Sequence, residues 1–260
     1  MSKLVSTITF SKKRENLLLF LIDGPKTLED IRSSLNVTSS GMIPQIRKLE
    51  EQNLVQREGK KYLLTDTGMI IAEMFNSFIK TIDIIEKYED FWAFHDVNAI
   101  PFHLLKRLYE LGDCRLVESK ISDIYEPHKE FMKYIAGAKK FMGIAPIFHQ
   151  LYPQLFMQLA ESGADVSIIL TKDIYEKTVK GHADMIEKFI SFENAQLFVS
   201  NYDIRLASAV TDSFFSISFF FKNNGYDSQS ELVSSENTAI KWGEELCDYF
   251  IKKSNKIKSV

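Results

Sequence analysis

The first 65 residues alternate apolar and polar positions in two different ways. Three segments are predicted to be helices, the first a short apolar run and the other two with apolar residues at spacings of three and four. The first is RENLLLFLI, which ends before Asp23-Gly24-Pro25, and the second begins after the cap-like Thr27. The third is expected from about Gly41 to Asn53, with Thr38 to Ser40 leading into it. With Ser40 as its cap, Pro44 loses only the first intrahelical hydrogen bond.

After Leu54 the pattern changes to that of a β-hairpin. Two short runs, VQR and YLL, flank a turn at Glu58-Gly59. A helix, a helix-turn-helix and a hairpin in this order are typical of a winged helix-turn-helix. The second helix of such a pair enters the major groove of double-stranded DNA.

The polar side chains of this region suit DNA. Gln pairs well with adenine, and Arg and Lys with guanine or phosphate. Cations at a hairpin tip are usually only solvated, but a hairpin that directly follows a recognition helix overhangs the phosphate backbone, which favours DNA contact. The residues expected to contact bases or nearby phosphates are Thr38, Ser39, Ser40, Gln45, Arg47 and Lys48, and those expected on the backbone are Arg57, Lys60 and Lys61.

A long helix is predicted from Thr65 or Thr67 to about Asp96. Apolar residues alternate there at intervals of four and three, apart from the polar Glu89, as in a coiled-coil seam. The positions expected to pair two subunits are Ile71, Phe75, Phe78, Ile82, Ile85 and Trp92. The same wide stripe could instead pack on a neighbouring domain of its own chain, or serve both purposes. The prediction is a homodimer.

Beyond Asn98 predicted helices and strands alternate. Helices are expected at Pro101 to Leu111, Pro127 to Ala138 and Glu236 to Lys253, and strands at Phe141 to Ala145, Val166 to Leu170, Gln196 to Val199 and Ser213 to Phe221. Ile168, Ile169 and Leu170 form a continuous apolar run, as in a strand buried on both faces. SFFSISFFF is too rich in phenylalanine for an exposed hairpin.

The fold class that follows is α+β, in three parts. They are an N-terminal winged helix-turn-helix in residues 1–66, a connecting helix in 67–96 and a C-terminal α/β sensor domain in 97–260.

Charge is distributed unevenly between these parts. Residues 1–64 hold eleven Lys or Arg against seven Asp or Glu, a net charge of +4, so the formal charge of −3 for the whole chain leaves −7 for the rest. The basic end is therefore the predicted DNA-binding end. No apolar run of membrane-spanning length and no secretory signal are evident, and a cytoplasmic protein without membrane attachment is expected. Cys114 and Cys247 are predicted to be buried apolar residues.

No common catalytic motif is present: GxSxG, GxxxxGK[ST], GxGxxG, HExxH and CxxC are all missing. The histidines are not at metal-ligand spacing, so neither a metal nor a cofactor is expected. The best candidate for a ligand site is GIAPIFHQLY, where a predicted strand ends at His149 and Tyr152. Ligands bind outside the carboxyl ends of strands in open α/β sheets, so Thr171 and Lys172 are expected to line the same crevice.

Several segments together resemble a known family. LxxIxxxLNVTSSxMxPxIRKLExxxLV, followed by VTDSFFSISFF, NNGYDSQSEL and AIKWGEELCDYFIKKS, is similar to the archaeal regulators built from a winged helix and a FilR-type sensor domain found in methanogens. The resemblance covers nearly the whole chain and implies dimeric, DNA-binding transcriptional control. It adds Asp212 to the candidate ligand residues; Tyr226 and Asp227 also match distinctive family positions, and a turn-capping role explains all three as well.

The C-terminal part is also similar in outline to the sensor of TrmB-type regulators, whose fold resembles phospholipase D. The HxK signature of that enzyme is absent, because His128 is followed directly by Lys129 and no other histidine has a lysine two residues later. Hydrolysis is therefore not expected.

The leading interpretation is a sequence-specific transcriptional regulator that binds operator DNA as a homodimer and senses a small-molecule effector. The alternative is a winged-helix scaffold for protein interactions without specific DNA binding, against which the basic wing argues. A third interpretation is that the C-terminal domain is an enzyme.

Overall fold

The chain folds into two compact units. The computed structural model describes residues 2–119, 134, 135 and 137–259. Contacts divide it into Met1–Ile82 and Asp83–Val260. The division falls inside the helix α5 (Asp66–Lys87), which the sequence assigns to a separate connecting part. No helix in the described part of the chain combines the length and the apolar character that a membrane span requires.

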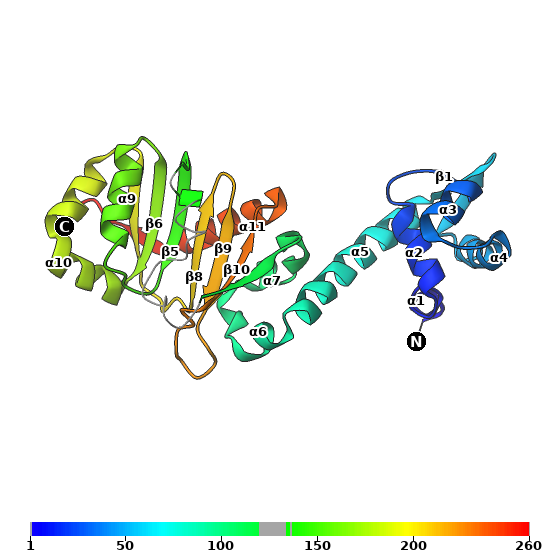
Figure 1. Ribbon diagram of the computed structural model, residues 1–260, viewed down its shortest axis with the longest axis horizontal. Helices are drawn as coiled ribbons and strands as arrows, with labels where there is room; N and C mark the ends of the chain where they lie inside the picture. Colours follow the sequence, from blue (N-terminus) through cyan, green and yellow to red (C-terminus); the bar gives the residue numbers. More distant parts are fainter. Residues whose placement is uncertain (1, 120–133, 136, 260) are drawn as a thin grey trace. The chain divides into compact units, whose positions relative to one another are not determined.

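The first unit is a winged helix-turn-helix, as the sequence predicts (Figure 1). Its elements before α5 are α1 (Lys3–Thr9), α2 (Lys12–Phe20), β1 (Lys26–Thr27), α3 (Leu28–Leu35), α4 (Ser39–Glu50), β2 (Val55–Glu58) and β3 (Lys61–Leu64). The strands form an antiparallel sheet in the order β1-β3-β2. One core of buried residues, including Leu17, Ile31 and Met42, joins the helices to the hairpin. The sequence did not indicate α1.

Side-chain caps fix where the two helices of the helix-turn-helix begin. Thr27 and Asp30 form a reciprocal capping box at the start of α3. The Thr27 amide and hydroxyl both donate to the Asp30 carboxylate and hold its pKa below the ordinary value. At α4 the cap is Thr38, whose hydroxyl accepts from the Gly41 amide at 3.2 Å.

The expected start of α4 at Gly41 was therefore wrong. Because Thr38 is the cap, the helix begins at Ser39 and Pro44 lies inside it. Proline has no N–H, so it cannot donate to the carbonyl of Ser40, four residues earlier. The helix ends at Glu50, near the left-handed Asn53, whose φ is 54°.

The wing turns at Gly59 and Lys60, between the paired residues Glu58 and Lys61. Gly59 has φ 58°, a conformation that glycine adopts without strain. The turn is thus one residue later than the predicted Glu58-Gly59.

The helix after the wing is shorter than predicted. Instead of continuing to Asp96, α5 ends at Lys87, Tyr88 leaves the helical conformation with φ −134°, and a short helix α6 (Glu89–Phe94) follows. The break lets Phe91 and Trp92 enter the core of the second unit. The Trp92 indole donates to the carbonyl of Ile84 at 3.1 Å, so Trp92 is a core residue and not part of a helical seam.

The second unit is built on a mixed sheet of eight strands (Figure 1). The order is β11-β7-β6-β5-β8-β9-β10-β4. The strands are β4 (Arg115–Glu118), β5 (Lys140–Ala145), β6 (Asp165–Thr171), β7 (Ala195–Ser200), β8 (Leu206–Thr211), β9 (Phe215–Phe219), β10 (Ser230–Ser234) and β11 (Ser254–Lys256). β5, β6 and β7 are parallel, and every other pairing is antiparallel.

Helices cover both faces of this sheet. α9 (Tyr152–Glu161) and α10 (Lys172–Ser191) connect the parallel strands and pack on one face, around Val166, Ile168 and Leu197. α11 (Asn237–Ile251) packs on the other face, where Trp242 is fully buried. That second core also contains residues from α6, α7 (Phe102–Leu105) and the 3₁₀ helix η2 (Leu108–Leu111); a further 3₁₀ turn, η1 (Val97–Ala99), precedes α7.

Several predicted elements of this unit are confirmed and several were missed. The strands at 141–145, 166–170 and 196–199 correspond to β5, β6 and β7, and Ile168, Ile169 and Leu170 are buried as expected. SFFSISFFF contains β9, which lies inside the sheet between β8 and β10. The predicted helix at 101–111 is split into α7 and η2. The predicted helix at 127–138 lies mostly outside the described residues, and α9, α10 and β8 were not predicted.

The contact between α11 and the sheet is close at Gly243. A Cβ at this position would lie 2.3 Å from Cδ2 of Phe215 and 2.9 Å from Cγ2 of Val210. No real contact is that short, so a side chain here would force the helix away from β8 and β9.

We therefore expect Gly243→Ala to lower the free energy of unfolding of the second unit by about 1–3 kcal/mol through overpacking. Gly181→Ala in α10 is the matched control, because nothing lies within 4 Å of a Cβ there. It should be neutral or stabilising by up to about 1 kcal/mol, from the better helix propensity of alanine. Both tryptophans, Trp92 and Trp242, lie in the second unit, so tryptophan fluorescence during denaturant unfolding reports on it. Equal stabilities of the two variants would contradict the packing argument.

Candidate functional site

The free face of α4 is polar and basic. Met42, Ile46 and Leu49 point into the core of the first unit, whereas Ser40, Pro44, Arg47 and Lys48 are exposed. Within the described structure, neither the Arg47 nor the Lys48 side chain makes a hydrogen bond or an ion pair. The face is therefore able to present two cations and a short hydroxyl to a ligand.

Two of the predicted contact residues on α4 have structural partners. Thr38 is occupied as the helix cap. Gln45 is half-buried, and its Oε1 accepts from Nη1 of the buried Arg14 at 2.7 Å. The amide oxygen of Gln45 is therefore engaged within the first unit, because Arg14 of α2 donates to it. Ser39 lies in the first turn and is half-buried.

The wing cations are exposed at the tip of the hairpin. Arg57 lies across the turn, where its Nε donates to the Gly59 carbonyl at 2.9 Å and its guanidinium lies 5.7 Å from the ring centre of Tyr62. Lys60 and Lys61 are both exposed. The hairpin thus groups three cations on one short element.

An apolar stripe is exposed on α5. Ile70, Met74 and Phe78, at successive intervals of four, are 62%, 68% and 57% exposed. The predicted seam residues Ile71 and Phe75 are instead half-buried and pack against the core of the first unit. The remaining seam positions are the half-buried Ile82 and Ile85, which is 39% exposed. The stripe is therefore rotated by one residue from the predicted seam at its N-terminal end.

The second unit contains two adjoining chambers beside the carboxyl end of β5. The apolar chamber has a volume of about 60 Å³ and lies between the sheet and the helices α9 and α10. Its lining includes Phe148, Ile168, Leu170, Met185 and Phe189. The polar chamber has a volume of about 100 Å³. Its lining includes Gly143, Ala207, Ala209, Ser208, Ser216, Ser218, Tyr226, Asp227, Ser230 and Glu231. Ala145, Ile147, His149, Tyr152 and Phe156 line both.

Small side chains in register leave the space for the polar chamber. Gly143 of β5 pairs with Ala209 of β8, and Ala209 pairs with Ser216 of β9. Ala207 pairs with Ser218 on the same face, two residues along each strand. The opposite face of these strands carries Met142, Val210, Phe215 and Ile217, which fill the core under α11. One face of the sheet is thus packed with large residues and the other is hollowed by small ones.

The hydroxyl groups of the polar chamber differ in how they are satisfied. Ser208 donates to the Ser216 carbonyl at 2.9 Å, and the hydroxyls of Ser218 and Tyr226 share a hydrogen bond of 2.7 Å. The Oγ of Ser216, in contrast, is fully buried and has no hydrogen-bond partner among the residues that the structure describes. Few buried polar groups in folded proteins lack a partner, so such a group calls for an explanation.

Both tyrosines of the chamber remain neutral. Burial, with a contribution from Glu231, raises the pKa of Tyr152 to about 12. Burial also raises the pKa of Tyr226 well above its ordinary value, although the hydrogen bond with Ser218 opposes this. Each phenol therefore keeps its proton near neutral pH.

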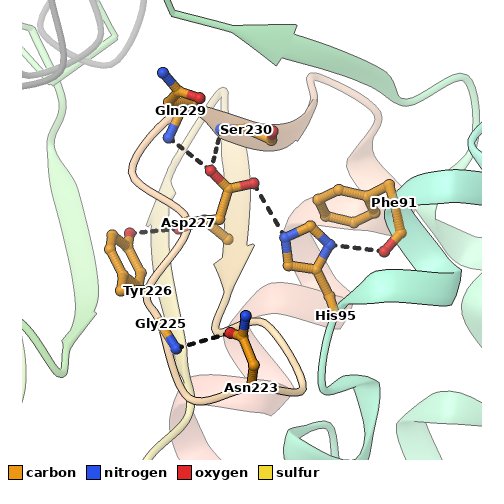
Figure 2. A network of polar contacts seen from close by, with 9 residues as sticks. Phe91, His95, Asn223, Gly225, Tyr226, Asp227, Gln229 and Ser230 are labelled. Atoms are coloured by element: carbon orange, nitrogen blue, oxygen red, sulfur yellow. Dashed lines mark hydrogen bonds and ion pairs between the residues drawn. The ribbon is translucent and has the colours of Figure 1, made fainter. Parts of the chain in front are cut away.

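Asp227 connects the chamber wall to the segment that follows α6 (Figure 2). Its Oδ1 accepts from the amides of Gln229 and Ser230 at 2.8 and 3.1 Å, and its Oδ2 lies 3.0 Å from Nε2 of His95. Burial would raise the pKa of Asp227, but the hydrogen bonds from His95, Ser230 and the Gln229 amide outweigh it and hold the pKa below its ordinary value.

His95 is placed between two acceptors. Its Nδ1 lies 2.7 Å from the carbonyl of Phe91, and its Nε2 faces the Asp227 carboxylate. Neither oxygen group can donate, so both ring nitrogens must carry protons for both bonds to form. The geometry therefore corresponds to an imidazolium paired with a carboxylate, and His95 and Asp227 are only 3% and 5% exposed.

Backbone bonds strengthen the same connection. The Asp96 amide donates to the Phe220 carbonyl at 2.9 Å, and the Lys222 amide donates to the Phe94 carbonyl at 3.0 Å. The ring of His95 stacks on Phe221, with ring centres 4.6 Å apart. Within the loop after β9, the Gly225 amide donates to Oδ1 of Asn223 at 3.2 Å (Figure 2). The end of α6 and the loop bearing Tyr226 and Asp227 thus form one connected region.

The structure brings together two of the five predicted ligand residues. His149 and Tyr152 line both chambers, with ring centres 4.8 Å apart, and Nδ1 of His149 accepts from the Leu151 amide. Thr171 is the cap residue of α10, and the exposed Lys172 lies 4.0 Å from Glu176; neither lines a chamber.

Asp212 also lies elsewhere, so its prediction as a ligand residue is not supported. Its carboxylate accepts from the amides of Lys139 and Lys140 at 2.9 and 3.4 Å, before and at the start of β5. These bonds, led by that from Lys139, lower the pKa of Asp212. His149 and Tyr152 follow the carboxyl end of β5, whereas Asp212 bonds to residues at its amino end. Asp212 therefore connects the β8–β9 turn to the opposite end of the strands from the chambers.

His95 and Ser216 were missed by sequence reasoning. His95 lies 132 residues from its partner Asp227, so no spacing could indicate the pair. Ser216 is hidden within a phenylalanine-rich strand, although the alternation of Ser216 and Ser218 with large residues in FSISF signals a face that is not filled by apolar side chains. The described residues contain no group of three or more His, Cys, Asp or Glu side chains placed to hold a metal ion. Cys114 and Cys247 are buried, as predicted, and burial raises the pKa of the Cys114 thiol to about 11.

Comparison with known proteins identifies the family. Residues 2–83 match the N-terminal domain, and residues 124–253 the middle domain, of the methanogenesis regulatory protein FilR1. The chain belongs to the FilR1 family. The FilR1 protein of Methanothrix harundinacea (strain 6Ac) is 26% identical over 263 residues, which cover 99% of this chain and 58% of that protein. The chain thus spans little more than half the length of this curated relative.

Solved structures show more distant likenesses. The archaeal chromatin protein TrmBL2, described as showing a novel mode of DNA binding, is 12% identical, with a TM-score of 0.46 over 95% of this chain and 94% of that one. Phosphatidylserine synthase of Haemophilus influenzae Rd KW20 is also 12% identical, with a TM-score of 0.42 over 56% of this chain and 40% of that one. Both TM-scores are below 0.5, so neither likeness supports a statement about this FilR1-family chain.

The His95–Asp227 pair should be sensitive to which partner is removed. His95→Phe leaves a buried carboxylate without its counter-charge and should lower the free energy of unfolding by about 3–5 kcal/mol at pH 7. Asp227→Asn should cost less, about 1 kcal/mol, because a neutral His95 can still donate to Phe91 and accept from the new amide.

Lowering the pH should reduce the difference in the free energy of unfolding between the wild-type protein and His95→Phe. The native pKa of Asp227 is lowered, so its charge stabilises the wild-type protein above about pH 4, the ordinary aspartate range, and the contribution is lost as the pH falls through the lowered pKa. In His95→Phe, protonation of Asp227 relieves the unpaired charge. Tryptophan fluorescence during urea unfolding from pH 7 down to about pH 2 measures both effects. A deficit that does not change with pH would show that lost packing, not charge, is responsible.

Proposed function

We propose that this FilR1-family chain is a DNA-binding transcriptional regulator that acts as a homodimer and whose second unit senses an effector. The observation that carries the proposal is the grouping of exposed cations on the two elements that a winged helix offers to DNA. These are Arg47 and Lys48 on α4 and Arg57, Lys60 and Lys61 on the wing. Membership in a family of regulatory proteins supports the same conclusion.

The two elements would contact different parts of the duplex. α4 would enter the major groove with Ser39, Ser40 and Arg47 near base edges, and Lys48 near bases or phosphate. Thr38 would hold the start of the helix, and Gln45 would have its Nε2 left for a base because its Oε1 is held by Arg14. The wing would lie on the flanking backbone, where its cations replace condensed counterions. A dimer would read two half-sites about 34 Å apart, or a multiple of that distance.

Dimerisation is proposed through the exposed stripe Ile70, Met74 and Phe78 of α5. Exposed side chains of this size at helical spacing are a poor surface for a monomer, whereas a second copy of α5 would bury them. Ile85 would extend the contact toward the end of the helix.

Effector sensing is proposed for the chambers beside β5. Tyr226 and Asp227 belong to the wall of the polar chamber, and Asp227 pairs with His95, directly after α6. A ligand that preferred one arrangement of this wall would bias the position of α6 and of the helix α5 that precedes it in the chain. Such coupling is limited by the difference in affinity between the two arrangements.

The first test is DNA binding across a salt series, with genomic fragments recovered by the purified full chain. A repeated or palindromic site, with a binding constant that falls steeply as the salt concentration rises, supports the proposal that the protein is a regulator. Lys60→Ala combined with Lys61→Ala should weaken binding to all sequences alike and reduce the slope by about 0.9 for each phosphate that is no longer neutralised. Lys252→Ala combined with Lys258→Ala, which removes two exposed lysines from the second unit, should leave the slope unchanged. Shallow binding without sequence preference would instead favour an interaction scaffold.

The dimer has a separate test in sedimentation velocity. Phe78→Asp places a charge in the stripe and should yield monomers at concentrations where the wild-type protein is a dimer. Asn76→Asp is the matched control, because it adds the same charge about 200° around the helix from Phe78. A Phe78→Asp variant that sediments like the wild-type protein would remove the stripe from the interface.

A further inference from the structure

The two chambers adjoin one another. They share five lining residues, among them His149, Tyr152 and Phe156. On one side of this shared wall the lining is apolar, with Ile168, Leu170 and Phe189. On the other side it consists mainly of hydroxyl-bearing and small residues. A molecule that occupied both chambers would have an apolar environment at one end and a polar environment at the other.

The size of the space limits its occupant. The chambers have volumes of about 60 and 100 Å³. A dry apolar cavity of about 150 Å³ is known to bind a single benzene molecule. The space is therefore sufficient for a molecule about the size of one substituted ring.

The charges of the lining argue against an anionic occupant. No Lys or Arg side chain is among the described residues that line either chamber, so an anion would have no counter-charge there, and the carboxylate of Glu231 in the polar chamber would repel it. The charge of Asp227 is already balanced by His95, and its other oxygen accepts two amides. Tyr152 and Tyr226 are neutral. Burying an anion without a counter-charge is strongly unfavourable, which excludes negatively charged molecules.

Ser216 indicates where a polar group would bind. Its Oγ is buried in the lining of the polar chamber and bonds to no group in the described part of the chain, so it can both donate to and accept from an occupant. Leaving such a group unpaired in the folded protein is unfavourable, and a hydroxyl, carbonyl or amide on a ligand would satisfy it.

We propose that the two chambers bind one small amphiphilic molecule without negative charge, with its apolar part between the sheet and α10 and its polar group on Ser216. The inference rests on the proposed sensing role of the second unit and gives that role a class of ligand. Selectivity follows from the lining: a purely apolar molecule leaves Ser216 unpaired, and an anion meets no balancing group.

Four probes of one shape test the class. Benzyl alcohol, toluene, benzoate and benzylamine differ only in the polar group on a single ring, and their dissociation constants can be measured by ligand-observed NMR with the full chain and no DNA. Benzyl alcohol should bind saturably and at least tenfold more tightly than benzoate, and benzylamine shows whether Glu231 pairs with a cation. Tighter binding of benzoate would overturn the proposal, as would the absence of saturable binding by all four.

Variants test the position of the polar group. Ser216→Ala should weaken the binding of benzyl alcohol by about threefold to tenfold, the usual contribution of one hydrogen bond, and leave the binding of toluene unchanged. Ser213→Ala, an exposed serine of the β8–β9 turn, is the matched control and should change neither. Ala209→Val, in register with Ser216, should weaken both by filling the chamber. Unchanged binding of benzyl alcohol to Ser216→Ala would overturn the assignment.

The result is independent of the proposed function as a whole. DNA binding is measured without any probe, so a chain that binds DNA but none of the four molecules would lose only the ligand assignment. A chain that binds benzyl alcohol but not DNA would lose the regulator and keep the site.

Discussion

The structure of the second unit depends on one constraint, which is that its wide sheet must bury both faces. Under α11 the strands carry large residues, and Gly243 brings the helix so close that Phe215 fills the space of a missing side chain. On the other face the same strands carry glycine, alanine and serine in register. Because neighbouring residues of a strand point to opposite faces, one set of strands can be tightly packed on one side and hollow on the other. The tightly packed side supplies stability that the hollow side does not.

The connection from the hollow side to the rest of the chain is polar. His95 and Asp227 come from segments far apart in sequence, and each satisfies the other inside the protein. A buried pair of this kind is a weak source of net stability, because desolvation offsets much of the attraction. Its geometry is nevertheless demanding, since both nitrogens of the imidazole and both oxygens of the carboxylate are engaged. The pair therefore determines how the chamber wall and the end of α6 are joined.

Local patterns predicted the first unit well and the second only in part. Caps, turns and short-range periodicity determine α3, α4 and the wing, and these signals lie within a few residues of the elements they define. The start of α4 was misplaced because Thr38 and Ser40 are both acceptable caps, and the structure uses Thr38, whose hydroxyl accepts from the Gly41 amide. In the second unit β5, β6 and β7 were evident from apolar runs. The pairing of His95 with Asp227, the register of Gly143, Ala209 and Ser216, and the break at Tyr88 depend on contacts between distant segments. No pattern within one segment contains that information.

Pro44 gives the exposed face of α4 a property that no side chain provides. Since proline cannot donate to the carbonyl of Ser40, a main-chain oxygen in the first turns of this helix lacks its usual internal donor. The carbonyl of residue 40 is available as an acceptor because residue 44 is proline, whatever side chain residue 40 carries. Relatives that keep proline at this position could exchange the side chain at position 40 and still offer the same acceptor to a base amino group or to water.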